Sequence, residues 1–221
     1  MTKKKRIGVL LSGCGVYDGS EIHESVLLLL AVDRAGAEAL CFAPNAPQRA
    51  VVNHLTGEEA AGERRNILVE SARIARGKIR PIGDLRASEV DALILPGGFG
   101  AAKNLSDFAS CGARCAVHSE VKRVIREIHA AGKPLGFICI APAVAARVLG
   151  EERPKLTIGA DPATAKALQE MGAEHVACGA QEIVEDPEKK IVSTPAYMLG
   201  KGIAEVADGI EKLVRRILAM A

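Results

Sequence analysis

The sequence predicts an α/β fold, a three-layer α/β/α sandwich with a mostly parallel central sheet. The chain has 221 residues, of which 48% are apolar and 25% charged, and this composition is typical of a globular protein. Several short apolar runs show little polar alternation, as expected for parallel strands covered on both faces. These runs alternate with helical patterns, which favours the sandwich. At this length a single hydrophobic core suffices, so we expect one domain over residues 1–221.

The expected strands and helices follow one another along the chain. The first strand, 7–12, precedes a helix at 24–35 that carries four consecutive leucines, so more than one of its sides should be buried. Gly36 and Gly132 suit the C-terminal ends of helices. The remaining expected strands are 39–43, Ala92–Leu95, Leu135–Ile138, 183–185 and 191–193, and the remaining helices are 64–76, 120–131, 162–171 and an amphipathic terminal helix, Ile203–Met220.

The composition excludes several classes of function. A net charge of +2, without Trp and with two Tyr, does not suit a nucleic-acid binder. The longest apolar run, 26–32, is far shorter than the ~20 residues that span a bilayer. Lys4 and its basic neighbours precede an apolar segment too short for a signal peptide, so we expect a cytoplasmic protein with reduced cysteines. The cysteine spacing predicts no metal site.

Three turns follow expected strands and should meet at the carboxyl edge of the sheet, where such folds bind ligands. The first, 13–19 (GCGVYDG), is not a dinucleotide fingerprint, because Asp18 stands where the third glycine belongs. The loop 44–62, rich in Pro, Asn and Gly, should cover the same edge. The second turn, 96–100 (PGGFG), fits either backbone donors for an oxyanion or a tight turn between a strand and a helix.

The third turn carries Cys139 directly after an apolar strand and before a stretch compatible with a helix. This context resembles the sharp turn that exposes a nucleophile above a sheet. Backbone N–H groups at the start of the helix would then lower the pKa of the thiol. The alternative is a buried structural cysteine, which we favour for the other five.

A nucleophilic thiol needs a proton partner, and no histidine adjoins Cys139 in the sequence. His54 lies in the long loop and remains open as a candidate. Glu21 and Glu24, three residues apart at the start of the first helix, are better placed, since a protonated carboxyl can donate to a thiolate. The alternative for either glutamate is simple stabilisation of the helix N-terminus.

Taken together, these segments resemble the ThiJ/PfpI superfamily, relatives of class I glutamine amidotransferases, and within it the ElbB subfamily. The matching stretches are 11–24 (LSGCGVYDGSEIHE), 53–57 (NHLTG), 96–105 (PGGFGAAKNL), 132–142 (GKPLGFICIAP) and 194–198 (TPAYM). The resemblance implies a flavodoxin-like sandwich, a homodimer and a glyoxalase that needs no cofactor or metal.

The resemblance also implies site residues. It makes Cys139 the nucleophile and places the oxyanion donors at the N–H groups of Gly98 and Ile140. The superfamily's glutamate lies twelve residues before the glycine that ends the first helix, which selects Glu24 over Glu21.

Two departures from the superfamily's sequence pattern narrow the range of expected activities. The chain lacks a histidine between the last strand and the last helix, so glutamine hydrolysis is not expected. Ile140 stands where peptidases of the superfamily have a histidine after the cysteine. We therefore expect a glyoxalase that takes glyoxal or methylglyoxal. The rival hypotheses are a redox-sensing or partner-binding module, in which Cys139 is oxidised, and a deglycase that repairs glycated proteins with the same residues.

Overall fold

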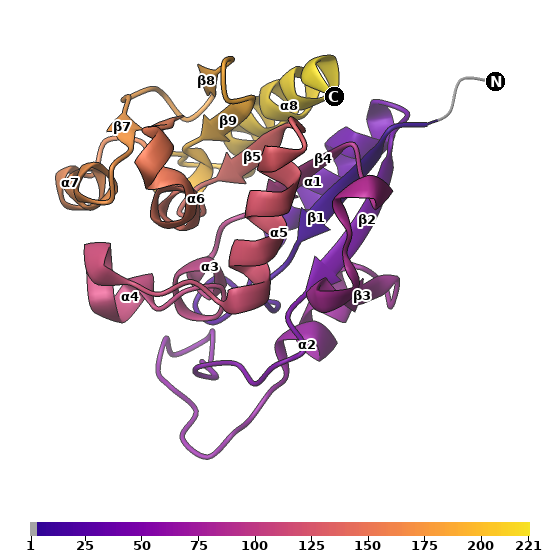
Figure 1. Ribbon diagram of the computed structural model, residues 1–221. Coiled ribbons are helices and arrows are strands. Elements are labelled where there is room, and N and C mark those ends of the chain that lie inside the picture. Colours follow the sequence, from indigo (N-terminus) through magenta and orange to yellow (C-terminus); the bar gives the residue numbers. More distant parts are fainter. Residues whose placement is uncertain (1–3) are drawn as a thin grey trace.

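The computed structural model describes residues 4–221 and confirms the mostly parallel α/β sandwich (Figure 1). A seven-stranded sheet has the order β3-β2-β1-β4-β5-β9-β8, and β8 runs antiparallel to β9. Its strands are β1 (Arg6–Leu10), β2 (Glu38–Ala43), β3 (Ile79–Pro81), β4 (Ala92–Leu95), β5 (Leu135–Ile138), β8 (Val184–Asp186) and β9 (Ile191–Thr194). Two further strands, β6 (Lys155–Leu156) and β7 (Glu174–His175), form a small separate parallel pair.

Helices cover both faces of the sheet. The helices are α1 (Ile22–Arg34), α2 (Ile67–Ile74), α3 (Phe99–Lys103), α4 (Phe108–Cys111), α5 (Ser119–Ala130), α6 (Pro142–Leu149), α7 (Pro162–Glu170) and α8 (Ile203–Met220). Buried residues of α1, α2 and α8 form one core with one face of the sheet, and those of α5 and α6 form a second core with the other. Side chains alternate between these cores along β1, where Val9 joins the first and Leu10 the second.

Some expected elements differ in extent. Helix α1 begins two residues earlier than expected, because Glu21 caps it by accepting the Glu24 N–H at 2.6 Å. Helix α2 is shorter than the expected 64–76, since Asn66 caps its start and accepts the Val69 N–H. Only part of the leucine run in α1 is buried: Leu28 is fully buried, whereas Leu30 is 40% exposed.

Three features of the structure concern membrane-spanning helices, metal sites and disulfide bonds. No helix within residues 4–221 combines the length and the hydropathy needed to cross a membrane. The same residues contain no cluster of three or more His, Cys, Asp or Glu side chains arranged to hold a metal ion. All six cysteines are free thiols.

Candidate active site

Cys139 occupies a strained turn at the carboxyl end of β5. Its φ of 61° lies in the left-handed region, which is uncommon for a residue with a side chain and typical of strained functional positions. The Cys139 N–H donates to the carbonyl of Thr194 on the neighbouring β9 at 2.9 Å, and α6 begins three residues later at Pro142. This strand-turn-helix geometry holds the thiol at the edge of the sheet, with 8% of the residue exposed.

Glu24 lies against the thiol and is fully buried. Its carboxylate accepts the Gly97 N–H at 2.9 Å and the Tyr197 N–H at 3.3 Å, and its side chain is hydrogen-bonded to Cys139. Glu21, the other candidate, caps α1 and lines the cavity described below. Of the two predicted glutamates, Glu24 is therefore the one that the structure brings to the sulfur.

The thiol is also in contact with the two predicted backbone donors. The N–H groups of Gly98 and Ile140 hydrogen-bond to Cys139 Sγ, and both interactions favour the thiolate. Gly98 has a φ of 92° and precedes α3, whereas Ile140 directly follows the cysteine. Backbone donors from the turns that follow β4 and β5 thus converge on one sulfur atom.

Burial and mutual repulsion control the protonation of the Cys139–Glu24 pair. Loss of solvation, helped by the charge of Glu21, raises the pKa of Glu24 to about 7. Burial and the adjacent Glu24 raise the pKa of Cys139 well above that of a free thiol. The sequence-based expectation of a lowered Cys139 pKa is therefore wrong, because desolvation and Glu24 outweigh the two N–H donors. Above about pH 7 the pair shares one proton and carries one negative charge.

Gly97 allows this close approach of Glu24 and Cys139. A side-chain carbon at position 97 would lie 2.4 Å from the Cβ of Cys139 and 2.7 Å from an oxygen of Glu24, far inside van der Waals contact. A carbon at Gly98 would lie 2.3 Å from the Glu21 backbone nitrogen. Both residues of the Gly-Gly pair are therefore required by tertiary contacts, which the sequence pattern alone left open.

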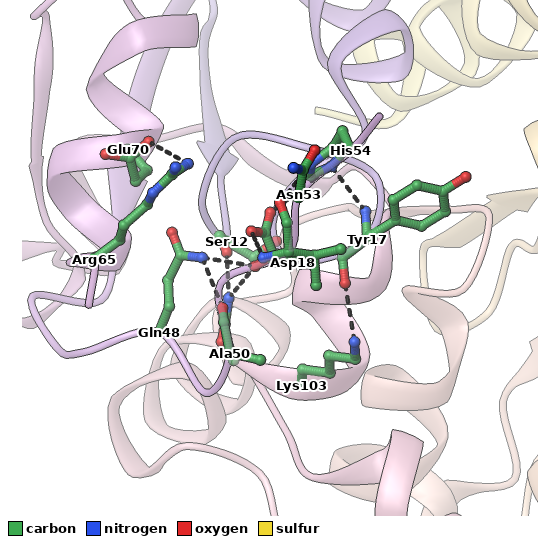
Figure 2. A network of polar contacts seen from close by, with 12 residues as sticks. Ser12, Tyr17, Asp18, Gln48, Ala50, Asn53, His54, Arg65, Glu70 and Lys103 are labelled. Atoms are coloured by element: carbon green, nitrogen blue, oxygen red, sulfur yellow. Dashed lines mark hydrogen bonds and ion pairs between the residues drawn. The ribbon is translucent and has the colours of Figure 1, made fainter. Parts of the chain in front are cut away.

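The loop 13–19 is held against the sheet by a network around Asp18 (Figure 2). The buried Asp18 carboxylate accepts the Val52 N–H at 2.8 Å, and its carbonyl accepts from Asn104 at 2.8 Å and from Gln48 at 3.1 Å. These contacts bring the loop 44–62 against the carboxyl end of β1, as expected. They also fix the backbone at Gly19, whose carbonyl accepts the N–H of Gly100.

His54 belongs to this network and not to the pair. Its Nε2 accepts the Tyr17 N–H at 3.2 Å (Figure 2). Its Nδ1 donates to the carbonyl of Val52 at 3.0 Å. Its Nε2 is also 3.8 Å from an oxygen of Asp18. These contacts hold His54 between the loops 13–19 and 44–62, and its hydrogen bonds go to Tyr17 and Val52 rather than to Cys139 or Glu24.

A different histidine is connected to the pair through Tyr197. His23 shares a 2.8 Å hydrogen bond with the hydroxyl of Tyr197, whose backbone N–H donates to Glu24. Sequence reasoning missed both Gly97 and Tyr197 as partners of Glu24, because they act through backbone N–H groups, which any residue type except proline provides.

The sulfur opens into a cavity of about 320 Å³. Its walls come from the loop 13–19 and from α3, α4 and α7, together with Tyr197 and Met198. Ligand pockets of roughly this size accommodate small organic molecules. The arrangement can therefore present a nucleophile, a proton carrier and two oxyanion donors to a bound carbonyl compound.

Comparisons with known proteins agree with this architecture. No family model matches the chain. It is 47% identical over 97% of its length to the human glutamine amidotransferase-like class 1 domain-containing protein 3, mitochondrial, of which it covers 83%, and 45% identical over 98% of its length to the rat mitochondrial ES1 protein homolog, of which it covers 84%. The crystal structure of an isoprenoid biosynthesis protein with an amidotransferase-like domain from Ehrlichia chaffeensis superimposes with a TM-score of 0.91 at 40% identity, over 98% of this chain and 99% of that one.

The chain belongs to the ElbB and ES1 family. This family is part of the ThiJ/PfpI superfamily, which includes enzymes. A DJ-1 superfamily protein from Salmonella typhimurium superimposes on this ElbB and ES1 family member with a TM-score of 0.55 at 25% identity, over 97% of this chain and 91% of that one.

Proposed function

We propose that the protein is a cofactor-independent glyoxalase that converts glyoxal or methylglyoxal to the corresponding 2-hydroxy acid. The observation that carries this proposal is the hydrogen-bonded pair of Cys139 and Glu24, buried at the end of a ligand-sized cavity. A shared proton between a thiol and a carboxyl group supplies both a nucleophile and a proton carrier, and internal oxidation and reduction of a dicarbonyl needs nothing more.

The reaction begins with attack of the Cys139 sulfur on an aldehyde carbon. A carbon–sulfur bond forms, and the carbonyl oxygen becomes an oxyanion near the N–H groups of Gly98 and Ile140 before it takes a proton. Glu24 then removes the hydrogen of the same carbon as a proton, and the electron pair moves to give an enediol.

Return of a proton to the second carbon gives a thioester of the 2-hydroxy acid. The first carbon is oxidised and the second reduced, so no external oxidant is required. Water attacks the thioester, the carbon–sulfur bond breaks, and the acid leaves with regeneration of the thiol.

The test is turnover of glyoxal by the wild type, Cys139→Ala and Glu24→Gln, each after treatment with a chelator. We expect each substitution to lower kcat by about a hundredfold or more, the lower range for loss of a general acid–base group. Equal rates of glyoxal turnover in all three proteins would refute the proposal.

The alternatives have weaker support. Redox-sensing thiols are exposed and have low pKa values, whereas Cys139 is buried and its pKa is raised. A deglycase would use the same residues, and assays with glycated peptides separate it from a glyoxalase. Glutamine hydrolysis is disfavoured, because Ala196 and its neighbours after β9 include no histidine.

We also propose that the protein is a cytoplasmic homodimer that binds neither nucleic acid nor membrane. Ile22, Val26 and Leu30 form an exposed apolar stripe along α1, each at least 40% exposed. A spacing of four residues puts such side chains on one side of a helix, where a second copy would bury them.

A further inference from the structure

The cavity at Cys139 is larger and less polar than glyoxal requires. Its volume of about 320 Å³ corresponds to roughly ten molecules of liquid water at ~30 Å³ each. Glyoxal consists of two joined aldehyde groups and carries no substituent to occupy the remaining space. Apart from Cys139, apolar side chains form most of the walls: Val16, Phe99, Ala102, Phe108, Ala109, Ile140 and Met198.

The polar wall residues are engaged by the protein itself. The hydroxyl of Thr164 donates to Asp161 at 2.6 Å, and that of Tyr197 is bonded to His23 at 2.8 Å. The carboxylate of Glu21, which also lines the cavity, accepts the Glu24 N–H at 2.6 Å. A ligand group that extends away from the sulfur therefore meets surface without a free hydroxyl donor, and polar groups there would lose hydrogen bonds to water.

We propose that the site takes an aldehyde with an apolar substituent of several carbons, which lies between α3, α4 and α7, and that glyoxal is only its smallest analogue. This inference rests on the proposed function for the chemistry, but its geometry depends only on the cavity. Ala102 and Ala109 determine the length of the substituent, because larger side chains at these two positions would fill the space.

The expected preference is large. Each additional buried CH₂ group stabilises binding enough to raise affinity about fourfold. A six-carbon chain that enters the cavity only in part should thus gain at least tenfold over a reagent without a chain.

The experiment measures alkylation of Cys139 in the full chain, because this needs no turnover. Three reagents are compared: iodoacetamide, N-hexyl iodoacetamide and an iodoacetamide with an ether chain of the same length. In each the sulfur displaces iodide from the CH₂ group and the thiol proton passes to solvent. Rates come from peptide mass spectrometry and are divided by the rate of the same reagent with N-acetylcysteine.

We expect the hexyl reagent to exceed both others at least tenfold in normalised rate. Ala109→Leu, at an exposed position of α4, and Ala102→Leu should each reduce this advantage at least fivefold. Ala204→Leu, an exposed alanine of α8 outside the cavity, is the matched control and should not reduce it. Normalised rates within twofold of each other for the three reagents would overturn the inference.

Turnover separates this inference from the proposed function. If the hexyl reagent is preferred but the protein turns over neither glyoxal nor 2-oxooctanal, the proposed glyoxalase activity is refuted. The inference of an apolar binding site is then still supported. Where turnover occurs, kcat/KM for 2-oxooctanal should exceed that for glyoxal at least tenfold, and equal values would overturn the inference.

Discussion

The carboxylate of Glu24 accepts the N–H of Gly97 at 2.9 Å, and the next N–H along the chain, that of Gly98, is directed to Cys139. Two consecutive amides of one turn thus stabilise the two acidic groups of the pair. Each donor favours the charged form of its own partner, while burial disfavours both charges. This competition leaves a single shared negative charge near neutral pH and leads to the first two predictions.

The stability of the protein should depend on pH through Glu24. The pKa of Glu24 is about 7 in the folded state and about 4.5 in the unfolded chain. Since the folded value is higher, the unfolded state binds fewer protons between these values, and stability falls as pH rises through this window. Glu24→Gln removes the effect. The free energy of unfolding of the variant minus that of the wild type should therefore be about 2 kcal/mol larger at about pH 8 than at about pH 5. Urea denaturation at both values measures this gain, and a constant difference would contradict it.

The reactivity of Cys139 should follow the titration of the pair. Below about pH 7 both groups hold a proton, and alkylation by iodoacetamide should be slow. The rate should rise through about pH 7 to a plateau and rise again only in alkaline solution, where the raised pKa of the thiol is reached. In Glu24→Gln the step near pH 7 should disappear. A step that persists in the variant would show that another group controls the thiol.

Gly97 tests how tightly the pair is packed. In Gly97→Ala the new carbon would overlap Cys139 and Glu24, so we expect a loss of about 1–3 kcal/mol in stability, as in other overpacked sites. Because the overlap displaces both reacting groups, turnover and Cys139 alkylation should fall at least tenfold. Gly179→Ala is the control, since a carbon there has only an ordinary contact at 3.8 Å. Wild-type activity in Gly97→Ala would show that the pair tolerates displacement.

The main elements of this fold could be predicted from local sequence, whereas the surroundings of the site could not. Apolar runs such as Leu135–Ile138 and the amphipathic pattern of α8 carry their own signal. Helices α3 and α4 have only five and four residues, too few to show a repeating helical pattern, and β3 has three residues, one of them proline. The raised pKa of Cys139 comes from its burial in the folded protein and from Glu24 of α1, which is distant in the chain, so the motif around residue 139 pointed in the wrong direction.

Asn104 should be the most sensitive residue of the network that supports the loop 13–19. Its amide donates to the carbonyls of Ser12 and Asp18, both at 2.8 Å, and its oxygen accepts the Arg49 N–H. Asn104→Leu removes the donor to the Ser12 carbonyl and leaves the Asp18 carbonyl with Gln48 alone. The Arg49 N–H also loses its acceptor, and we expect a loss of about 3 kcal/mol in the free energy of unfolding. Asn53→Ala is the control, because Asn53 lies beside the network (Figure 2) but is exposed, and its side chain accepts only the Leu55 N–H of its own turn. Equal losses in urea denaturation would show that the network is not concentrated at Asn104.

The apolar stripe on α1 should control self-association. Val26 lies at its centre and is 50% exposed, so Val26→Asp would place a charge where a second copy is expected to pack. Sedimentation equilibrium should show a dimer for the wild type and a shift to monomer by at least tenfold in the dissociation constant for the variant. Leu55→Asp is the matched control: Leu55 is 93% exposed, but it lies in a loop away from α1 and should leave the dimer intact. A dimer that persists in Val26→Asp would show that the interface lies on another surface. Because α1 also carries Glu24, the monomeric variant shows in addition whether turnover requires the partner.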